Sequence, residues 1–579
     1  MPSRVVTTAD VRCTVPELRS RGGMVASNHR LAAEAGAAIL ARGGNAIDAA
    51  AAVSFAVGVV EPAMSGLGGR GYLVIRFGAS GETAVIDGHE RAPRAATPDM
   101  FEVADVRERP NPGWGPEVPV VGQANIIGHR AVAVPAVLGA IALAHGRFGR
   151  LPLAAVLEPA ITLAEDGFDV SVALAAAIAQ HRGKLARYPA AAAVFLPGGA
   201  APAPGERLVQ RDLGRTLRRI AGRGPDEFYT GEIAGAIDAE MVRGGGLVTR
   251  RDLAEFRPRV WAGPLAGTYR GYHILTVPEA TGGVTLLQIL NLLESIDTAA
   301  FEPFDPRYLH LLLEVFRAAF RDRLAVIDDP AFTPVPYAGL ASKAFAAARG
   351  RALSPDRSVD PLDPADPWPF DGARDGALPP SRHASWRAPA VEHETTHFCV
   401  VDGERTVVSM TQSIIDAFGS GVVVPGTGIL LNSCMHNFNP VPGQLRSIAP
   451  WKRSVHNGVP VIVLRGDGRP LLAVGGAGGT KIITGVAQIL VNLLDRGWDV
   501  QRAVEAPRVH NEGDASQVDG RLGTETADRL ARIGHTVSIV TPRYARPVFS
   551  RINAIVIDAD GELAAGTDQF GDAGAAGVE

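Results

Sequence analysis

Thr395 is the residue whose surroundings point most directly to chemistry. It follows Glu394 at the end of a segment rich in Pro, Asp, Arg and Ala, and it begins a run of β-favouring residues. A threonine at a chain N-terminus can act as a nucleophile, because its own α-amino group serves as the base. A free α-amine has a pKa of about 7.7–8.0, so part of it is neutral near pH 7. An internal threonine lacks this base, so the pattern predicts a cut before Thr395.

The precursor can make this cut itself. The Thr395 hydroxyl would attack the Glu394 carbonyl, and water would then hydrolyse the resulting ester. We therefore expect self-cleavage between Glu394 and Thr395, which leaves the threonine with its own amine.

Two hydroxyl side chains follow on the next predicted strand. Asp402-Gly403 stands between two β-rich runs, and this dipeptide is typical of a two-residue hairpin turn. Pairing about that turn places Thr395 opposite Met410, with Thr411 and Ser413 beside it. A hydroxyl in this position can orient both the threonine Oγ and its amine.

Acyl transfer also needs donors for the oxyanion that forms on the attacked carbonyl. Residues 471–481 read Leu-Leu-Ala-Val-Gly-Gly-Ala-Gly-Gly-Thr-Lys, a predicted strand that runs through glycines into a helix. Such a turn exposes backbone N–H groups at the helix N-terminus, and Gly478 and Gly479 are the candidate donors. Taken alone, the glycines are explained equally well by close packing of the strand against the helix.

Helices dominate before the threonine and strands dominate after it. Periodicity predicts helices over 31–40, 46–60, 217–243 and 308–323, two more within 134–167, and strands over 72–77 and 83–86. Further strands are predicted over 395–401, 405–411, 428–431, 459–464 and 471–474, and a helix over 481–494.

These patterns divide the chain into three parts. Residues 1–351 form a region of helices and strands, and residues 395–579 form a second region that begins with the nucleophile. Between them, residues 352–394 have little periodicity and few aliphatic side chains, so we expect an exposed, mobile segment.

The composition is that of a soluble globular protein. The 579 residues are 46% hydrophobic, 20% charged and 6% aromatic, with a formal net charge of −4. We expect no nucleic-acid partner, because no basic patch is present. The longest apolar stretch, Ala49–Val60, is too short to span a bilayer, so we expect no membrane association. The first residues lack an apolar signal segment, which predicts a cytoplasmic location.

Two patterns suggest other classes of protein. Residues 66–71, Gly-Leu-Gly-Gly-Arg-Gly, fit the dinucleotide fingerprint GxGxxG. They follow a helical run and precede a strand, the reverse of the required order, which argues against an NAD-binding protein. The histidines from His383 to His456 lack the spacing of zinc ligands. We therefore expect neither a metal nor a cofactor.

The chain resembles the γ-glutamyltransferase family over nearly its whole length. The most specific matches are Thr-Thr-His-Phe-Cys-Val-Val-Asp at 395–402, Gly-Ile-Leu-Leu-Asn at 428–432 and Gly-Gly-Thr-Lys-Ile-Ile at 478–483. The resemblance implies an α+β fold, the four-layer αββα sandwich of the N-terminal-nucleophile (Ntn) hydrolases. It also implies a zymogen that cuts itself into a large and a small subunit, residues 395–579 being the small one. The subunits would stay together, as a heterodimer or a dimer of heterodimers.

The same resemblance assigns roles at the site. It makes Thr395 the nucleophile and Ser413 the helper hydroxyl, and it makes Gly478 and Gly479 the oxyanion glycines. The pocket for the acyl donor departs from the family. The arginine that clamps the donor's α-carboxylate falls at His89, and Arg91, two residues further on, would share its face on a strand. The remaining donor contacts of the family are also replaced, at Ile415, Cys434, Asn437, His456 and Asn457.

Losing most of these contacts changes the ligand, because histidine cannot reproduce bidentate recognition by arginine. We expect an amidohydrolase that works through an acyl-enzyme on Thr395. Its donor would carry a small polar or anionic acyl group without a free α-amino group. A true γ-glutamyltransferase, or glutathione hydrolase, is the alternative. A non-catalytic, unprocessed scaffold is a third possibility.

Overall fold

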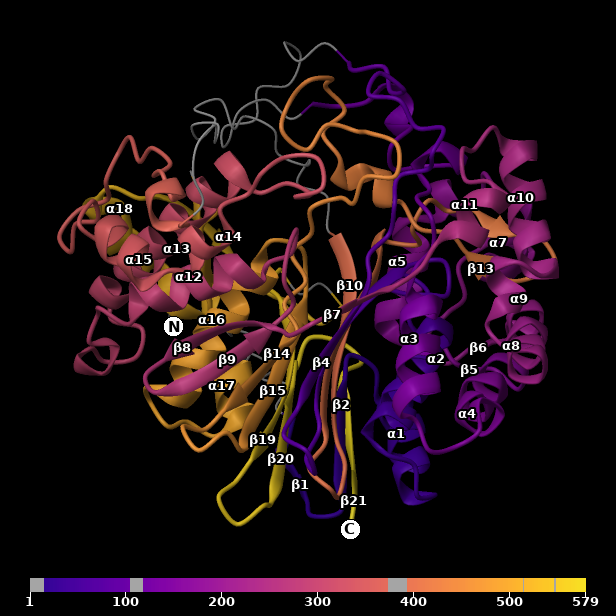
Figure 1. Ribbon diagram of the computed structural model, residues 1–579, viewed down its shortest axis with the longest axis horizontal. Helices are drawn as coiled ribbons and strands as arrows, with labels where there is room; N and C mark the ends of the chain where they lie inside the picture. The colour runs from indigo at the N-terminus through magenta and orange to yellow at the C-terminus, as the bar shows by residue number, and fades with distance from the viewer. Residues whose placement is uncertain (1–14, 105–117, 373–392, 514, 546–547) are drawn as a thin grey trace, which may run out of the picture.

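Two stacked β-sheets form the centre of the molecule, and helices cover the outer face of each (Figure 1). The computed structural model describes residues 15–104, 118–372, 393–513, 515–545 and 548–579. The layers follow the order helix, sheet, sheet, helix, which confirms the predicted αββα sandwich.

The first sheet contains the predicted nucleophile on its third strand. Its strand order is β21-β2-β10-β11-β3-β4-β7, and neighbouring strands are antiparallel. The strands are β2 (Gly23–Ser27), β3 (Arg70–Arg76), β4 (Thr83–Gly88), β7 (Arg259–Trp261), β10 (His393–Val401), β11 (Val407–Asp416) and β21 (Gly574–Val578).

The second sheet has the order β1-β20-β19-β15-β14-β9-β8 and is also antiparallel. Its strands are β1 (Leu18–Ser20), β8 (Leu265–Tyr269), β9 (Tyr272–Thr276), β14 (Val461–Leu464), β15 (Pro470–Ala477), β19 (Arg551–Ile557) and β20 (Leu563–Thr567). Short strands form smaller ladders elsewhere: β5 (Phe168–Asp169), β6 (Arg207–Leu208), β12 (Val423–Val424), β13 (Ile429–Leu430), β16 (Val509–His510), β17 (Ala515–Asp519) and β18 (Thr536–Val540).

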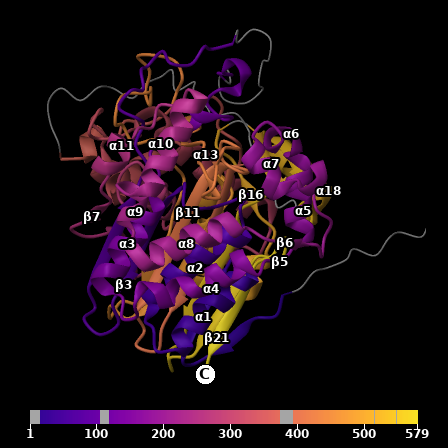
Figure 2. The same ribbon diagram turned by 90° about the vertical axis from the view of Figure 1, so that its right-hand side faces the viewer.

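Apolar helices bury the outer face of each sheet. The first sheet is covered by α1 (Arg30–Ala41), α2 (Ala46–Val60) and α3 (Val137–Phe148), and α4 (Leu153–Glu165) packs on the far side of α2; Figure 2 shows these helices in front. The second sheet is covered by α12 (Gly283–Leu293), α16 (Lys481–Leu494) and α17 (Val500–Glu505), and α13 (Pro306–Val326) packs against α12. The predicted helices over 46–60 and 481–494 are confirmed with the same bounds. None of the helices in the described ranges has the length and apolarity needed to cross a membrane.

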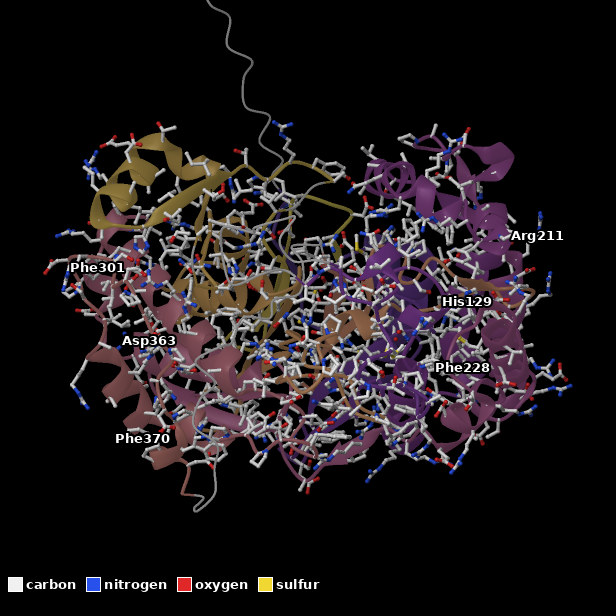
Figure 3. All side chains as sticks on the ribbon, turned by 90° about the horizontal axis from the view of Figure 1, so that it is seen from above. His129, Arg211, Phe228, Phe301, Asp363 and Phe370 are labelled. Atoms are coloured by element: carbon white, nitrogen blue, oxygen red, sulfur yellow. The ribbon has the colours of Figure 1, made fainter. Side chains whose placement is uncertain are left out.

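Further helices lie outside these layers. Seen from above, those near Arg211 and Phe228 lie on the opposite side of the molecule from the segments around Phe301 and Phe370 (Figure 3). The predicted helix over 217–243 is broken by Gly224, at φ 89°, into separate helices. These outer helices are α5 (Val172–Gln180), α6 (Arg182–Leu185), α7 (Pro189–Phe195), α8 (Arg211–Arg223), α9 (Asp226–Tyr229), α10 (Glu232–Gly244), α11 (Arg250–Glu255), α14 (Tyr337–Ala341), α15 (Lys343–Gly350) and α18 (Gly523–Ile533).

The hairpin of β10 and β11 does not have the predicted register. Val401 pairs with Val407, so residues 402–406 form the connection in place of a two-residue turn. The Asp402 carboxylate closes this longer loop, because its Oδ1 accepts hydrogen bonds from the backbone N–H groups of residues 404 and 406. Met410 therefore lies opposite Phe398 and not opposite Thr395.

Thr395 instead occupies a β-bulge. The regular pairing of Thr396 with Gln412 breaks off, and the next pair is Glu394 with Ile415. Two residues of β11, one of them Ser413, thus face Thr395 alone. Bulges of this kind re-aim a side chain and occur often beside active sites.

The segment between the two halves of the chain is partly anchored. Glu314 accepts a hydrogen bond from the Val359 backbone, Asp322 accepts one from the Ala365 backbone, and Leu362 is buried. The prediction of an exposed segment is therefore wrong for Leu362. Residues 373–392, which belong to the same predicted segment, lie outside the described residues.

The two sheets approach closely where β15 passes β10. A Cβ added to Gly475 would lie 2.3 Å from Cε1 of His397, which is fully buried and hydrogen-bonded at both ring nitrogens. Only glycine fits at position 475, where the two strands cross. His397, which it faces, is two residues from the predicted nucleophile.

We predict that Gly475→Ala destabilises the protein by about 1–3 kcal/mol, the usual cost of overpacking a core. Gly466→Ala is the matched control, because its added Cβ would have its nearest contact at 3.6 Å. Thermal unfolding of both variants checks this. Equal melting temperatures would show that the sheets can separate without cost at Gly475.

Candidate active site

A hydroxyl relay joins Thr395 to the carbonyl that it is predicted to attack. Thr395 Oγ1 donates a hydrogen bond to Ser413 Oγ at 3.3 Å, and Ser413 Oγ donates to the Glu394 carbonyl oxygen at 2.7 Å. The backbone N–H of Ile415 donates to the same Ser413 Oγ at 2.9 Å. Thr395 and Ser413 are both buried.

The direction of each bond in this relay is determined by the atoms present. A hydroxyl has one hydrogen and two acceptor positions, and the Ile415 N–H can only donate. Ser413 therefore gives its hydrogen to the carbonyl and accepts the hydrogen of Thr395. This arrangement polarises the scissile carbonyl and turns the Thr395 hydrogen towards Ser413, away from the carbon to be attacked.

An uncommon backbone conformation supports the relay. Ile415 has φ 81°, a value that β-branched residues rarely adopt. Residues held this way cost on the order of 1–3 kcal/mol and occur preferentially at functional sites. Ile415 is also one of the positions at which the resemblance implies a replaced donor contact.

Thr411 faces His397 and not Thr395. Its Oγ1 lies 2.9 Å from His397 Nδ1, and the two residues are paired across the hairpin. Burial lowers the pKa of His397 to about 3, so that this imidazole is neutral. His397 is therefore a hydrogen-bonded core residue between the sheets.

The predicted oxyanion glycines form the turn between β15 and α16. Gly478 has φ 126° and Gly479 has φ 63°, both in the region that favours glycine. Gly479 lines a small cavity with Thr395, and both glycines line a larger cleft beside it. The conformation of the turn, in addition to strand–helix packing, thus requires glycine here.

The small cavity brings together seven of the predicted site residues. Its volume is about 30 Å³, which holds about two water molecules. No acyl chain fits into this space. The predicted residues that line it are Thr395, Thr411, Ser413, Asn437, His456, Asn457 and Gly479.

Stacked rings occupy the region behind this cavity. His456 stacks on Tyr72 with 3.9 Å between centroids, and the His89 ring packs edge-on at 4.8 Å from His456. Burial, helped by the Arg70 cation, lowers the pKa of His456 well below its usual value. Burial followed by the Arg453 charge does the same for His89. His89 therefore presents a neutral ring at the position where the resemblance implies a charged arginine.

Arg91 and Cys434, two predicted donor-binding residues, line neither space. β4 ends at Gly88, so His89 and Arg91 both lie beyond the strand, and the prediction that they share a strand face is wrong. The Arg91 guanidinium donates to the Trp451 carbonyl oxygen at 3.3 Å and lies 3.9 Å from the Asp329 carboxylate. Cys434 is fully buried in an apolar cluster, and burial raises its pKa well above the usual value.

The larger cleft opens beside Thr395 and has a volume of about 540 Å³. It shares Asn437, Asn457 and Gly479 with the small cavity. Its other lining includes Glu394, Arg551 and the apolar side chains of Leu174, Phe320, Phe549 and Phe570. This cleft has room for a substrate.

Arg551 is the cleft residue that sequence reasoning missed. Its Nη2 donates to Glu394 Oε2 at 2.8 Å and to the Thr395 carbonyl oxygen at 3.2 Å. It lies 156 residues from Thr395 in the sequence. No motif marks it, so only the pairing of β19 with β15 places it here.

A buried carboxylate, Glu61, lies behind the nucleophile strand. Its Oε2 accepts a hydrogen bond from Thr396 Oγ1 at 2.7 Å. Burial raises the pKa of Glu61 to about 7, and the Arg551 charge opposes this shift. Glu61 thus changes charge near neutral pH. Its hydrogen-bond donor, Thr396, is the residue that follows Thr395 on the strand.

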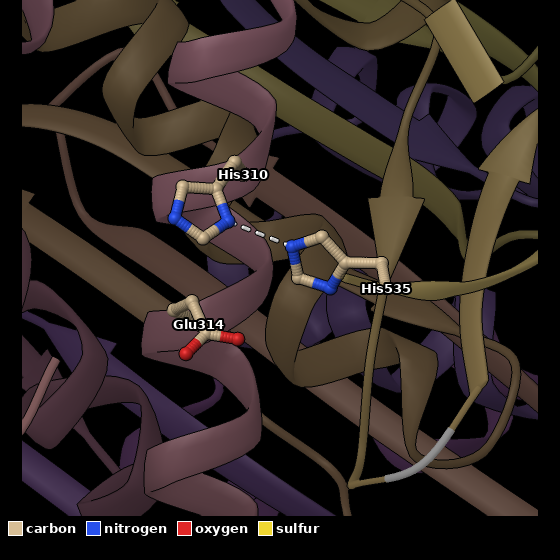
Figure 4. Close-up of side chains that lie close together, drawn as sticks. All are labelled: His310, Glu314 and His535. Atoms are coloured by element: carbon tan, nitrogen blue, oxygen red, sulfur yellow. Dashed lines mark hydrogen bonds between the residues drawn. The ribbon is translucent and has the colours of Figure 1, made fainter. Parts of the chain in front are cut away.

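A separate polar cluster lies far along the chain from these residues. His310 and Glu314 lie on α13, and His535 approaches from the loop before β18 (Figure 4). His310 Nε2 bonds the Ser354 carbonyl, His310 Nδ1 bonds His535 Nε2 at 2.8 Å, and His535 Nδ1 bonds the Ser516 hydroxyl. Glu314 accepts bonds from Ser358 and the Val359 backbone. Because these protein groups already satisfy one another, we assign the cluster no chemical role.

We predict that Ser413→Ala slows self-cleavage about 10²-fold or more, because removing one donor to a reacting carbonyl typically costs this much. Ser413→Thr keeps the hydroxyl and should cleave at a rate close to that of the wild type. A time course of the two fragments on a denaturing gel measures both rates. Rapid cleavage of Ser413→Ala would refute the role given to the relay.

Glu61 predicts a pH dependence of stability. Its pKa in the folded protein is above its ordinary value of 4.5, so its stabilising contribution is complete below that value and is lost as pH rises through about 7. The unfolding free energy relative to Glu61→Gln should fall by at most about 1.4 kcal/mol per pH unit in this window. Denaturant titrations at pH 5, 6 and 7 measure it. Glu404→Gln is the control, because Arg150 lowers the pKa of Glu404. A pH-independent difference for Glu61→Gln would contradict the assignment.

Comparisons with known proteins identify the family of this chain. A family model described as gamma-glutamyltranspeptidase matches residues 32–578. The acylase ACY 1 proenzyme of Pseudomonas sp. (strain SE83) is 39% identical over 563 residues, which cover 97% of this chain and 94% of that protein. The glutathione hydrolase proenzyme of Bacillus subtilis (strain 168) is 34% identical over 517 residues, covering 89% of this chain and 85% of that protein.

A solved structure agrees over the whole chain. The crystal structure of cephalosporin acylase from Bacillus halodurans is similar with a TM-score of 0.84 and 30% sequence identity, and the match covers 100% of both chains. The predicted family and fold are thus confirmed. The chain belongs to the γ-glutamyltranspeptidase family of self-processing Ntn hydrolases.

Proposed function

We propose that Thr395 is the nucleophile of a self-cleaving amide hydrolase. The observation that carries this proposal is the hydroxyl relay from Thr395 through Ser413 to the Glu394 carbonyl. Thr395 Oγ attacks that carbonyl carbon and the C–N bond breaks. The nitrogen takes up the proton and becomes the amine of Thr395. Water then cleaves the ester, which leaves a carboxylate on Glu394 and restores the threonine hydroxyl.

Substrate turnover repeats this chemistry with a new base. The α-amine released by cleavage accepts the Thr395 Oγ proton, and Oγ attacks the amide carbonyl of the donor. The leaving amine takes the proton, and water hydrolyses the acyl-enzyme. The Gly478–Gly479 turn and the Ser413 hydroxyl supply donors for the oxyanion.

The two fragments remain associated because both sheets contain strands from each of them. In the first sheet, β10 and β11 of the later fragment lie between β2 and β3 of the earlier one. Cutting the bond before Thr395 removes none of these ladders. Separation would expose the apolar layer between the sheets to water.

The donor differs from a γ-glutamyl group. The position of the family's α-carboxylate clamp holds the neutral rings of His89, His456 and Tyr72, which fill the space. This favours a small polar or anionic acyl group without a free α-amine, in line with a relative that is named an acylase. A true glutathione hydrolase is the second candidate, supported by the relative of that name.

We predict that Thr395→Ala abolishes both self-cleavage and turnover of every acyl anilide tested, whereas Thr395→Ser retains both. A gel shows the fragments, and release of p-nitroaniline measures turnover. The α-ammonium group of γ-glutamyl-p-nitroanilide meets a neutral side chain at Asn437, which lines both spaces. Its kcat/KM should therefore be at least about 10²-fold below that of the preferred donor. Turnover by Thr395→Ala would exclude the mechanism, and efficient turnover of the γ-glutamyl anilide would favour the second candidate.

A further inference from the structure

In the precursor, the acyl group that Thr395 attacks is Glu394 itself. From its reacting carbonyl the side chain runs through Cα, Cβ and Cγ to a carboxylate, and that carboxylate lies 2.8 Å from Arg551 Nη2. The same Nη2 donates to the Thr395 carbonyl oxygen at 3.2 Å. Arg551 is thereby held at a defined place relative to both the nucleophile and the reacting carbon.

During substrate turnover, the acyl group of the substrate bonds to Thr395 Oγ in place of the Glu394 acyl group. The ester formed during self-cleavage and the acyl-enzyme formed from a donor share one bond, from an acyl carbon to Thr395 Oγ. After hydrolysis the Glu394 carboxylate is no longer covalently tied beside Arg551. Arg551 stays in place, because it begins β19 and pairs with Ala477 next to the glycine turn.

Building on the function proposed above, we propose that Arg551 binds the terminal carboxylate of a dicarboxylic acyl donor. The spacing in Glu394 sets the length: three carbon atoms separate the reacting carbonyl from the carboxylate carbon. The matching donor is an amide of a five-carbon ω-carboxyacyl group, that is, a glutaryl amide. No α-amino group is required.

The charges around Arg551 fit this role. Glu61 and Asp568 also stabilise the cation, but of the carboxylates in the described ranges only that of Glu394 comes within ion-pair distance. Glu61 accepts a bond from Thr396, and Asp568 lies 3.9 Å from Arg508. The Arg551 side chain is only 11% exposed. A buried cation that loses its ion-pair partner creates a site for another carboxylate.

The volumes of the two spaces favour the cleft lined by Arg551 as the place for the acyl chain. The small cavity beneath the family's donor position holds about 30 Å³, whereas the cleft that Arg551 lines holds about 540 Å³. Arginine suits the task because its planar guanidinium can bind a carboxylate through two hydrogen bonds. It also compensates for the clamp that is missing at His89.

The test compares two anilides of equal chain length on the processed wild type. Glutaryl-p-nitroanilide should have a kcat/KM at least 100-fold above that of pentanoyl-p-nitroanilide, which carries a methyl group in place of the carboxylate. Arg551→Met should reduce that ratio at least 30-fold, mainly through a higher KM for the glutaryl anilide. Arg543→Met, which removes another cation from the lining of the cleft, should leave the ratio within threefold.

A second measurement covers an Arg551→Met chain that fails to cleave or fold. Glutarate should inhibit the wild type competitively, and pentanoate at the same concentration should not. Equal turnover of the two anilides by wild type, no turnover of the glutaryl anilide, or no inhibition by glutarate would overturn the role of Arg551. If one of these results is found but the wild type still hydrolyses the pentanoyl anilide and Thr395→Ala does not, the role of Arg551 is refuted and the proposed function is supported. A wild type that stays uncleaved and inactive towards both anilides would instead refute the proposed function.

Discussion

The Ser413 hydroxyl, shared between the Thr395 hydroxyl and the Glu394 carbonyl, is the interaction on which the chemistry of this site depends. It exists because the β10–β11 hairpin is irregular at one point. The bulge at Thr395 sets Ser413 beside the nucleophile, and the left-handed Ile415 aims its N–H at the same oxygen. A regular hairpin would have continued the ladder through this position, as it does from Thr396 to Val401.

The two-sheet sandwich keeps these residues in place when the bond before Thr395 is cut. Each sheet contains strands of both fragments, so the bond before Thr395 can be cut while the ladders between the fragments remain. The glycine turn and Arg551 reach the site from the second sheet, on the paired strands β15 and β19. In the proposed mechanism, the nitrogen of Thr395 can therefore change from an amide in the precursor to a base in the processed enzyme while its surroundings stay in place. The rings of Tyr72, His89 and His456 pack together at the position where the resemblance implies the donor clamp of the family.

Much of the fold and the reacting centre could be predicted from the sequence, because these depend on local periodicity and on contiguous motifs. Helices 46–60 and 481–494 carry their boundaries in their own residues. The structure brings Thr395, Ser413 and Gly479 into one cavity, and their roles stay predictions. The hairpin register failed because the Asp402 side chain stabilises a longer loop than Asp-Gly usually forms. Arg91 was misplaced because β4 ends three residues before it. Arg551 carries no local signal, since its role arises from pairing between strands far apart in sequence.

The most direct test of the central claim is the identity of the N-terminal residue in active enzyme. N-terminal sequencing together with intact-mass measurement of purified, active protein should find a fragment of residues 395–579 that begins with an unmodified Thr395 amine. Full activity in material whose chain is unbroken between Glu394 and Thr395 would contradict the account, because the threonine would then have no amine of its own to act as the base.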